Sequence, residues 1–219
     1  MFLSIKRIRE RLIMEYEYKW IISDEKMFRK IATSNTVASF VLSKNDIHMQ
    51  AIYYDTANQL LKQMGGALRL RKENDDTLCC LKLKEQGEGA YKTRKEFEVE
   101  ADNIYDGLTG LASDVDESTD ICTVLKNSTF VELCRMNFLR QAYLLNIELS
   151  SGSCRGELAF DYGEISLDTR SMLICEMEFE YKSGDFQTFH NFADLLQKEF
   201  RLTPQPLSKF ARAMGLSNV

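Results

Sequence analysis

Charged side chains recur at every second residue along several segments of this sequence. The rows, in chain order, are Glu15 with Glu17 and Lys19, Arg69 with Arg71, Lys82 with Lys84, Arg94 with Glu96, Glu98 and Glu100, Glu157 with Asp161, and Glu176 with Glu178 and Glu180. Side chains two residues apart on a β-strand point to the same face, so each row marks one face of a strand. Lysine and arginine bind phosphate oxygens, and carboxylates are the ligands that Mg²⁺ and Mn²⁺ prefer. The rows therefore indicate a site for a polyanion held together with divalent cations.

The separation of positive from negative rows strengthens this interpretation. A single charged row has an ordinary explanation, because a half-buried strand turns its charged face to water. Like charges on neighbouring strands are destabilising, so a merely solvated sheet mixes the two signs. Two successive basic strands and one strand with three carboxylates are better explained if a phosphate chain and its cations neutralise them. If the sheet closes with these faces inward, the interior is a polar tunnel and helices must cover the apolar outside.

Eight segments alternate between polar and apolar residues, which is typical of β-strands. They span residues 14–22, 50–55, 67–72, 78–84, 91–100, 140–149, 156–162 and 172–182. The pairs Gly65-Gly66 and Gly87-x-Gly89 favour hairpins and thus antiparallel neighbours. We expect helices over 24–43, 117–136, 185–200 and 206–214, with Asp185 and Ser208 as N-caps. This pattern predicts an α+β protein with a barrel or a sandwich.

Composition excludes several classes of protein. The 219 residues include 28 Lys and Arg against 33 Asp and Glu, and this net charge of −5 argues against a nucleic-acid binder. No apolar run approaches the roughly 20 residues of a membrane-spanning helix. The six cysteines lack C-x-x-C spacing, which favours reduced thiols and a cytoplasmic protein. The two histidines are far apart, which argues against zinc chemistry and a Ser-His-Asp hydrolase.

Three parts of the chain lie outside the regular pattern. Residues 1–13 mix basic and apolar side chains, which is typical of an amphipathic helix at a membrane. The interpretation we favour is that they are an extension before a single domain over 14–219. Segment 101–136 is acidic, and we expect a solvated loop and a covering helix, with a gate at a tunnel mouth as the alternative. The chain ends three residues beyond Leu216, so we expect no further domain there.

From Met14 to about Leu216, the motifs resemble the CYTH domain of the triphosphate tunnel metalloenzymes. In chain order they are Glu15-x-Glu17-x-Lys19, Tyr53-Tyr54-Asp55-Thr56, Gly66-Ala67-Leu68-Arg69-Leu70-Arg71, Leu81-Lys82-Leu83-Lys84, Arg94-x-Glu96, Glu157-x-x-x-Asp161-x-Gly163, Cys175-Glu176-x-Glu178-x-Glu180 and Ser208-Lys209-x-x-Arg212. Within the family, they are most similar to bacterial inorganic triphosphatases. The resemblance implies an eight-stranded antiparallel β-barrel that forms a triphosphate tunnel with a charged interior and a cover of helices.

The resemblance also implies roles for the residues at matching positions. The phosphate oxygens would be bound by Lys19, Arg69, Arg71, Lys82, Lys84, Arg94, Lys209 and, as an addition from the sixth segment, Arg140. One metal ion would be held by Glu15, Glu17 and Glu178. A second metal ion and the attacking water would be held by the catalytic residues Glu96, Asp161 and Glu180. The remaining inward carboxylates either support the site or form salt bridges behind it; they are Glu98, Glu157 and Glu176.

The reaction that the resemblance implies is hydrolysis of inorganic triphosphate (tripolyphosphate) to pyrophosphate and phosphate with Mg²⁺ or Mn²⁺. Such a reaction needs in-line water and charge neutralisation rather than a protein nucleophile. Thiamine triphosphatase, nucleoside triphosphatase and class IV-type adenylate cyclase activities remain alternatives; they require a stacking site, for which Tyr53, Tyr91 and Phe138 are candidates. A non-catalytic polyphosphate-binding module is a further alternative, although it would not need so many ordered carboxylates. The expected partner is thus a small polyanion, without nucleic acid or membrane, in an undetermined oligomeric state.

Overall fold

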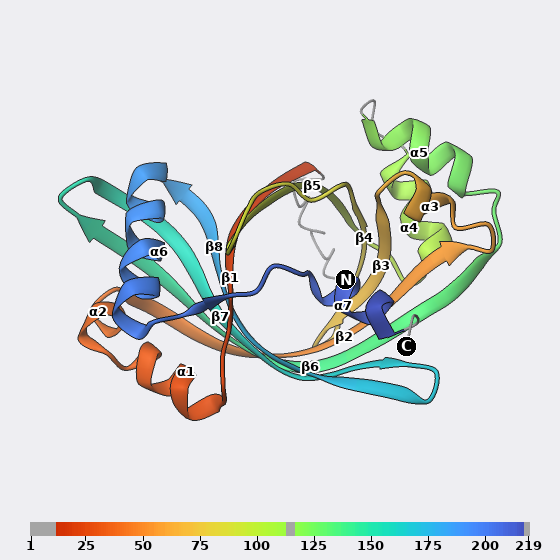
Figure 1. Ribbon diagram of the computed structural model, residues 1–219. Helices are drawn as coiled ribbons and strands as arrows, with labels where there is room; N and C mark the ends of the chain where they lie inside the picture. Colours follow the sequence, from red (N-terminus) through yellow and green to blue (C-terminus); the bar gives the residue numbers. More distant parts are fainter. Residues whose placement is uncertain (1–11, 113–116, 217–219) are drawn as a thin grey trace, which may run out of the picture.

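The computed structural model describes residues 12–112 and 117–216, which form a closed β-barrel flanked by helices (Figure 1). The strands are β1 (Leu12–Ile21), β2 (Val41–Thr56), β3 (Ala67–Glu73), β4 (Asp76–Lys82), β5 (Tyr91–Glu100), β6 (Phe130–Leu149), β7 (Gly152–Leu167), β8 (Arg170–Gly184) and the short β9 (Thr203–Pro204). Their order is β5-β4-β3-β2-β6-β7-β8-β1, and β1 also pairs with β5, which closes the ring. Every pairing is antiparallel, so the predicted eight-stranded barrel is confirmed.

The helices cover the outside of this barrel on two sides, and one helix lies across its opening (Figure 1). On one side are α1 (Glu25–Ala32), α2 (Asn35–Ala38) and α6 (Phe186–Phe200); on the other are α3 (Leu60–Gln63), α4 (Ile104–Leu111) and α5 (Glu117–Leu125); across the opening is α7 (Lys209–Leu216). No helix within the described residues is long and apolar enough to cross a membrane.

Two apolar clusters attach the helices to the outer face of the barrel. Phe189, Phe192 and Leu196 of α6 are fully buried in a cluster that includes residues of β1 and β8. Leu108 and Leu111 of α4 belong to a second cluster with residues of β4 and β5. Burial of such side chains contributes about 1.5–3 kcal/mol each, which offsets the cost of a polar interior. The apolar parity of the strands therefore faces outward, as the sequence predicts.

Two predicted helices were wrong at their C-terminal ends. The helix expected over 24–43 is the two short helices α1 and α2, and β2 begins at Val41 rather than at residue 50. The helix expected over 117–136 ends at Leu125, and β6 begins at Phe130 rather than at residue 140. The reason is long-range pairing, because the first parts of β2 and β6 form a backbone ladder with each other. The first part of β2 shows little alternation of apolar residues, so the sequence pattern gives no sign of a strand there.

The other regions singled out by sequence have mixed outcomes. Asp185 caps α6 by accepting a hydrogen bond from Thr188 N at 2.6 Å, and Ser208 Oγ accepts one from Ala211 N at 3.1 Å, so both N-cap predictions are confirmed. The acidic segment supplies α4 and α5 on the outside of the barrel. Residues 1–11, Asp114 and Asp116 lie outside the described residues.

Candidate active site

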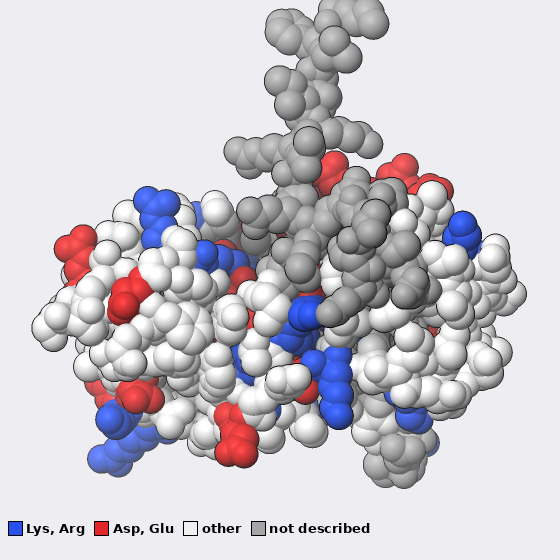
Figure 2. Space-filling model, turned by 90° about the horizontal axis from the view of Figure 1, so that it is seen from above, with Lys and Arg blue, Asp and Glu red and all other residues white. Residues whose placement is uncertain are grey.

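The barrel interior holds a cavity of about 710 Å³ that all eight strands and α7 line. All eight residues predicted to bind phosphate line it, as do the three predicted ligands of the first metal ion: Lys19, Arg69, Arg71, Lys82, Lys84, Arg94, Arg140 and Lys209, with Glu15, Glu17 and Glu178. Figure 2 shows Lys and Arg side chains near the middle of the visible face, with Asp and Glu among them. The charged rows therefore converge on one interior space.

Strands β3, β4 and β5 bring a basic row against an acidic one. Lys82 ion-pairs with Glu96, its cross-strand neighbour, and Arg94 Nε donates to Glu96 Oε1 at 2.5 Å. Burial would raise the pKa of Glu96, but the Lys82 and Arg94 charges outweigh burial and hold it well below its usual range. Arg71 donates to Glu98 at 3.1 Å. Glu98 therefore supports the basic row from the side of β5.

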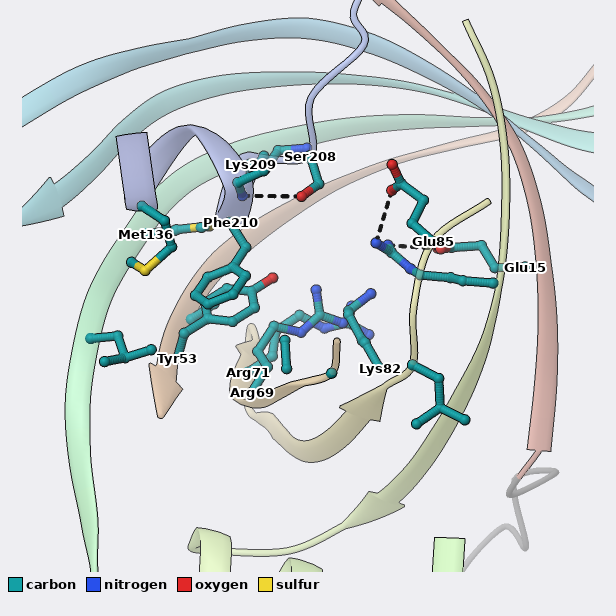
Figure 3. A pocket seen from close by; sticks show the side chains of 18 of the residues that line it. Glu15, Tyr53, Arg69, Arg71, Lys82, Glu85, Met136, Ser208, Lys209 and Phe210 are labelled. Carbon is teal, nitrogen blue, oxygen red and sulfur yellow. Dashed lines mark hydrogen bonds and ion pairs between the residues drawn. The ribbon is translucent and has the colours of Figure 1, made fainter. Parts of the chain in front are cut away.

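Arg69 is a buried cation that lines the cavity. Its side chain is buried, and its Nε and Nη2 have no hydrogen-bond partner within the described residues. Burial opposes its charge, but Tyr53 and Cys80, followed by Glu96 and Glu98, raise the pKa of Arg69, so the guanidinium stays charged. Figure 3 shows Arg69 and Arg71 pointing into the cavity beside the Tyr53 ring. A planar cation with free donors is suited to phosphate oxygens.

The wall formed by β1 carries carboxylates whose buried oxygens lack hydrogen bonds. Glu15 Oε2 lies 2.8 Å from Arg94 and Glu17 Oε1 lies 2.9 Å from Lys19, yet neither oxygen accepts a hydrogen bond of good geometry within the described residues. Burial, with Glu17 and Glu96 nearby, raises the pKa of Glu15 to about 7 despite Arg94. Both carboxylates therefore line the cavity in ion pairs with cations of the same wall.

Glu85, in the loop after β4, lies among the cations of this wall. Its carboxylate is 3.3 Å from Arg94, 3.5 Å from Lys19 and 4.0 Å from Lys92. Sequence reasoning missed both Glu85 and the buried Lys92. The parity of Lys92 with Arg94 on β5 could have indicated Lys92, whereas Glu85 lies in a loop where strand parity gives no signal.

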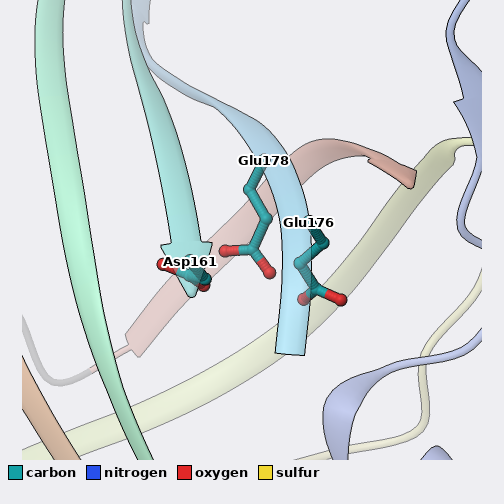
Figure 4. Close-up of side chains that lie close together, drawn as sticks. All are labelled: Asp161, Glu176 and Glu178. Atoms are coloured by element: carbon teal, nitrogen blue, oxygen red, sulfur yellow. The ribbon is translucent and has the colours of Figure 1, made fainter. Parts of the chain in front are cut away.

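A second cluster of charges lies where β6, β7 and β8 meet α7. Arg140 donates from Nε and Nη2 to the two oxygens of Asp161 at 2.8 and 2.7 Å, and it also bonds to Glu178. Lys209 Nζ lies 2.7 Å from Asp161 and 2.8 Å from Glu178, and it also pairs with Glu176. The three carboxylates converge in Figure 4, and each has an oxygen within 4.8 Å of the others. We call Asp161, Glu176 and Glu178 the carboxylate triad.

The triad differs from the predicted second metal site, because the structure does not gather the three members of that site. Glu96 pairs with Lys82 and Arg94. Glu180 lies 2.8 Å from Lys182, which also approaches Glu157 at 4.0 Å. Glu176 lies opposite Asp161 in the β7–β8 register and takes the place expected for Glu180. The roles assigned to Glu96, Asp161 and Glu180 stay predictions.

The three carboxylates predicted to hold the first metal ion line the cavity, but their oxygens do not form a group within 4.8 Å of one another. Glu15 and Glu17 lie two residues apart on β1, and Glu178 of β8 is the cross-strand neighbour of Lys19 on β1. Carboxylate oxygens are the hard ligands that Mg²⁺ and Mn²⁺ take. Carboxylates of both groups already have cationic partners, since Glu178 contacts Lys209 and Arg140, Glu15 contacts Arg94, and Glu17 contacts Lys19. The assignment of a metal ion to Glu15, Glu17 and Glu178 stays a prediction.

One side of the cavity is apolar, which the expectation of a charged interior did not include. Tyr53 of β2 stacks on Phe210 of α7, with ring centroids 4.7 Å apart and planes 13° apart. Met49, Met136 and Phe138 line the same side. Tyr91, the third aromatic candidate, does not line the cavity and instead packs beside Tyr18 and His190.

Comparison with known proteins relates this geometry to a family. The model of the CYTH domain matches residues 14–214. An inorganic triphosphatase of Haemophilus influenzae is 26% identical over 212 residues, which are 94% of this chain and 56% of that protein, so this chain spans little more than half its length.

Solved structures share the fold. One is a Hippeastrum protein described as a putative adenylyl cyclase with a dominant triphosphatase activity (TM-score 0.64, 18% identity, 92% of this chain and 95% of that chain). Another is a Pyrococcus horikoshii protein (TM-score 0.56, 20% identity, 92% of this chain and 99% of that chain). Since the family model spans nearly all of the sequence and the barrel has the matching topology, the protein belongs to the CYTH domain family.

Proposed function

We propose that this protein hydrolyses the terminal phosphate of inorganic triphosphate, with Mg²⁺ or Mn²⁺. The observation that carries the proposal is the convergence of the eight predicted Lys and Arg residues and three predicted carboxylates on one cavity inside a closed barrel. Hydrolysis of a phosphoanhydride needs the substrate positioned in line with water and its negative charge neutralised. The triphosphatase named among the relatives supports the same reaction class.

The basic residues divide the work of binding between two sides of the cavity. Arg69, Arg71 and Lys82 approach from β3 and β4, and Arg94 approaches from β5. Lys209 and Arg140 approach from α7 and β6. A linear chain of phosphates placed between the two groups would have its oxygens contacted along its length. The guanidinium groups provide fixed donor geometry, and the ammonium groups provide mobile charge.

The carboxylates would hold the cation and orient water. Glu15, Glu17 and Glu178 are the residues that the family resemblance assigns to a divalent ion, and all three line the cavity. The ion would supply charge neutralisation and a lowered pKa of water when bound. Glu96, Asp161 and Glu180 would then orient the attacking water, as the family resemblance implies. Water is the nucleophile, so no serine or cysteine is needed.

Release of phosphate from tripolyphosphate tests the proposal, with Mg²⁺, Mn²⁺ or EDTA present. We expect metal-dependent turnover that is lost in Arg71→Ala and Glu178→Ala. Lys72→Ala is the matched control, because Lys72 follows Arg71 on β3 and its exposed side chain does not line the cavity. Turnover that survives in EDTA, or in Glu178→Ala, would contradict the proposed mechanism.

An organic triphosphate is the second candidate substrate, and the apolar side of the cavity favours it. The cavity volume of about 710 Å³ lies within the range of roughly 300–1,000 Å³ typical of sites for small organic ligands. The Tyr53–Phe210 pair could contact a ring or another apolar group next to the phosphates. Rates on tripolyphosphate, ATP and thiamine triphosphate, measured with wild type and Phe210→Ala, separate the two candidates. Phe210→Ala should impair hydrolysis of an organic substrate more than that of tripolyphosphate.

A further inference from the structure

Helix α7 is attached to the barrel by two cationic side chains on one of its faces. Lys209 and Arg212 are three residues apart, and both contact Glu176 of β8. Lys209 ion-pairs with Glu176 Oε1, and Arg212 Nη2 donates to Glu176 Oε2. The Glu176 side chain is completely buried. Both of its oxygens are therefore in ion pairs with cations of α7.

The two cations differ in their relation to the cavity. Lys209 lines the cavity and also contacts Asp161 and Glu178. Arg212 is not among the residues that line the cavity, and Glu176 is its ion-pair partner within the described residues. Arg212 is thus placed behind the site, where it can hold the helix without touching a substrate.

The apolar contacts of α7 are few for a helix that must stay in place. Ala213 is its fully buried residue, while Phe210 and Met214 are partly buried. Phe210 stacks on Tyr53 at the cavity wall. A short helix with so little buried surface is not stable by itself and depends on its tertiary contacts. The buried pair between Arg212 and Glu176 is therefore a large part of what docks α7.

We propose that Arg212 and Glu176 are positioning residues that dock α7 across the barrel opening and so fix the Lys209 ammonium group in the cavity. The kinetic part of this inference rests on the proposed function. When α7 is docked only part of the time, apparent substrate affinity falls in proportion to the docked fraction. Saturating substrate restores docking, because the phosphates attract Lys209. Loss of Arg212 should therefore raise KM and leave kcat nearly unchanged.

Two measurements on the full chain test the proposal. Hydrogen exchange of the α7 amides without substrate reports docking directly. We expect faster exchange in α7, with the barrel unchanged, for Arg212→Met and Glu176→Gln. Arg212→Lys should restore part of the protection because it keeps the charge. Arg29→Met is the control, since Arg29 forms an exposed ion pair with Glu25 on α1.

Kinetics on tripolyphosphate provide the second readout. Arg212→Met should raise KM about tenfold, equivalent to about 1.4 kcal/mol, with kcat within about twofold of wild type. Unchanged α7 exchange in Arg212→Met and Glu176→Gln would overturn the proposal, as would a fall in kcat without a rise in KM. If wild type releases no phosphate, the proposed function fails, and the exchange measurement still decides whether this pair docks α7.

Discussion

Substitution of Arg140 separates its contribution to folding from its contribution to substrate binding. Arg140 donates two hydrogen bonds to Asp161, which is completely buried, and it also bonds to Glu178. Arg140→Met keeps much of the side-chain volume and removes the charge. Asp161 and Glu178 then share Lys209 as the remaining cation in contact with both.

The structure sets the expected magnitude. Breaking a buried ion pair costs about 3–5 kcal/mol, because the surviving charge stays buried without compensation. Since Lys209 still contacts both carboxylates, we expect the lower end, a loss of about 3 kcal/mol in the free energy of unfolding. Urea unfolding at pH 7 measures it. Lys84→Met is the control, because Lys84 lines the cavity with an exposed side chain and should change stability by less than about 0.5 kcal/mol.

A double-mutant cycle identifies the buried carboxylate as the cause. Arg140→Met combined with Asp161→Asn should be more stable than the sum of the two single losses predicts, by about 1 kcal/mol or more. Under the proposed function, both Arg140→Met and Lys84→Met lower tripolyphosphate turnover. A stability loss below about 1 kcal/mol for Arg140→Met would refute the argument from buried charge.

Three further perturbations follow from the geometry. Glu85→Gln frees cations at the cavity wall, so it should lower KM for tripolyphosphate about two- to fivefold, as initial rates will show; an increase in KM would contradict this. Hydrogen bonds from Thr188 lower the pKa of Asp185, so the stabilisation by this cap is fully present above pH 3.8 and is lost as the pH falls through the lowered pKa. Melting temperatures of wild type and Asp185→Ala should therefore converge on acidification. Gly163→Ala would place a methyl group against the β6 backbone and should cost about 1–3 kcal/mol in urea unfolding. In Gly215→Ala the new methyl group has no atom of the described residues within 4 Å, so this control should cost little.

The lining of the barrel could be predicted from sequence because strand parity depends only on the spacing of residues. Lys19, Arg69 and Lys82 each alternate with apolar neighbours, and all three line the cavity. One face of each strand must be apolar to bind the covering helices. The opposite face is then inside the barrel wherever the sheet closes.

The pairing of the charges could not be predicted, because parity gives the face of a residue and not its neighbour. Asp161 meets Glu176 through the β7–β8 register, and Arg140 meets Asp161 through the β6–β7 register. The stack of Tyr53 on Phe210 joins residues far apart in the sequence, on a strand and on the last helix. The lengths of β2 and β6 were missed for the same reason, since their ends are fixed by pairing with each other.

The separated rows of the sequence become complementary pairs inside the barrel, and this has a consequence for ligand binding. Lys82 contacts Glu96, and Lys209 contacts Glu178, so a phosphate group that takes either cation leaves the carboxylate with fewer cationic partners, Arg94 for Glu96 and Arg140 for Glu178. A buried carboxylate without compensation is costly. A divalent cation bound to the carboxylates would remove that cost, so polyanion and cation should favour each other's binding, as linkage requires of any two coupled ligands. Equilibrium binding of tripolyphosphate, measured with and without the divalent cation, tests this coupling, because a barrel that balanced its charges without the cation would show the same affinity in both.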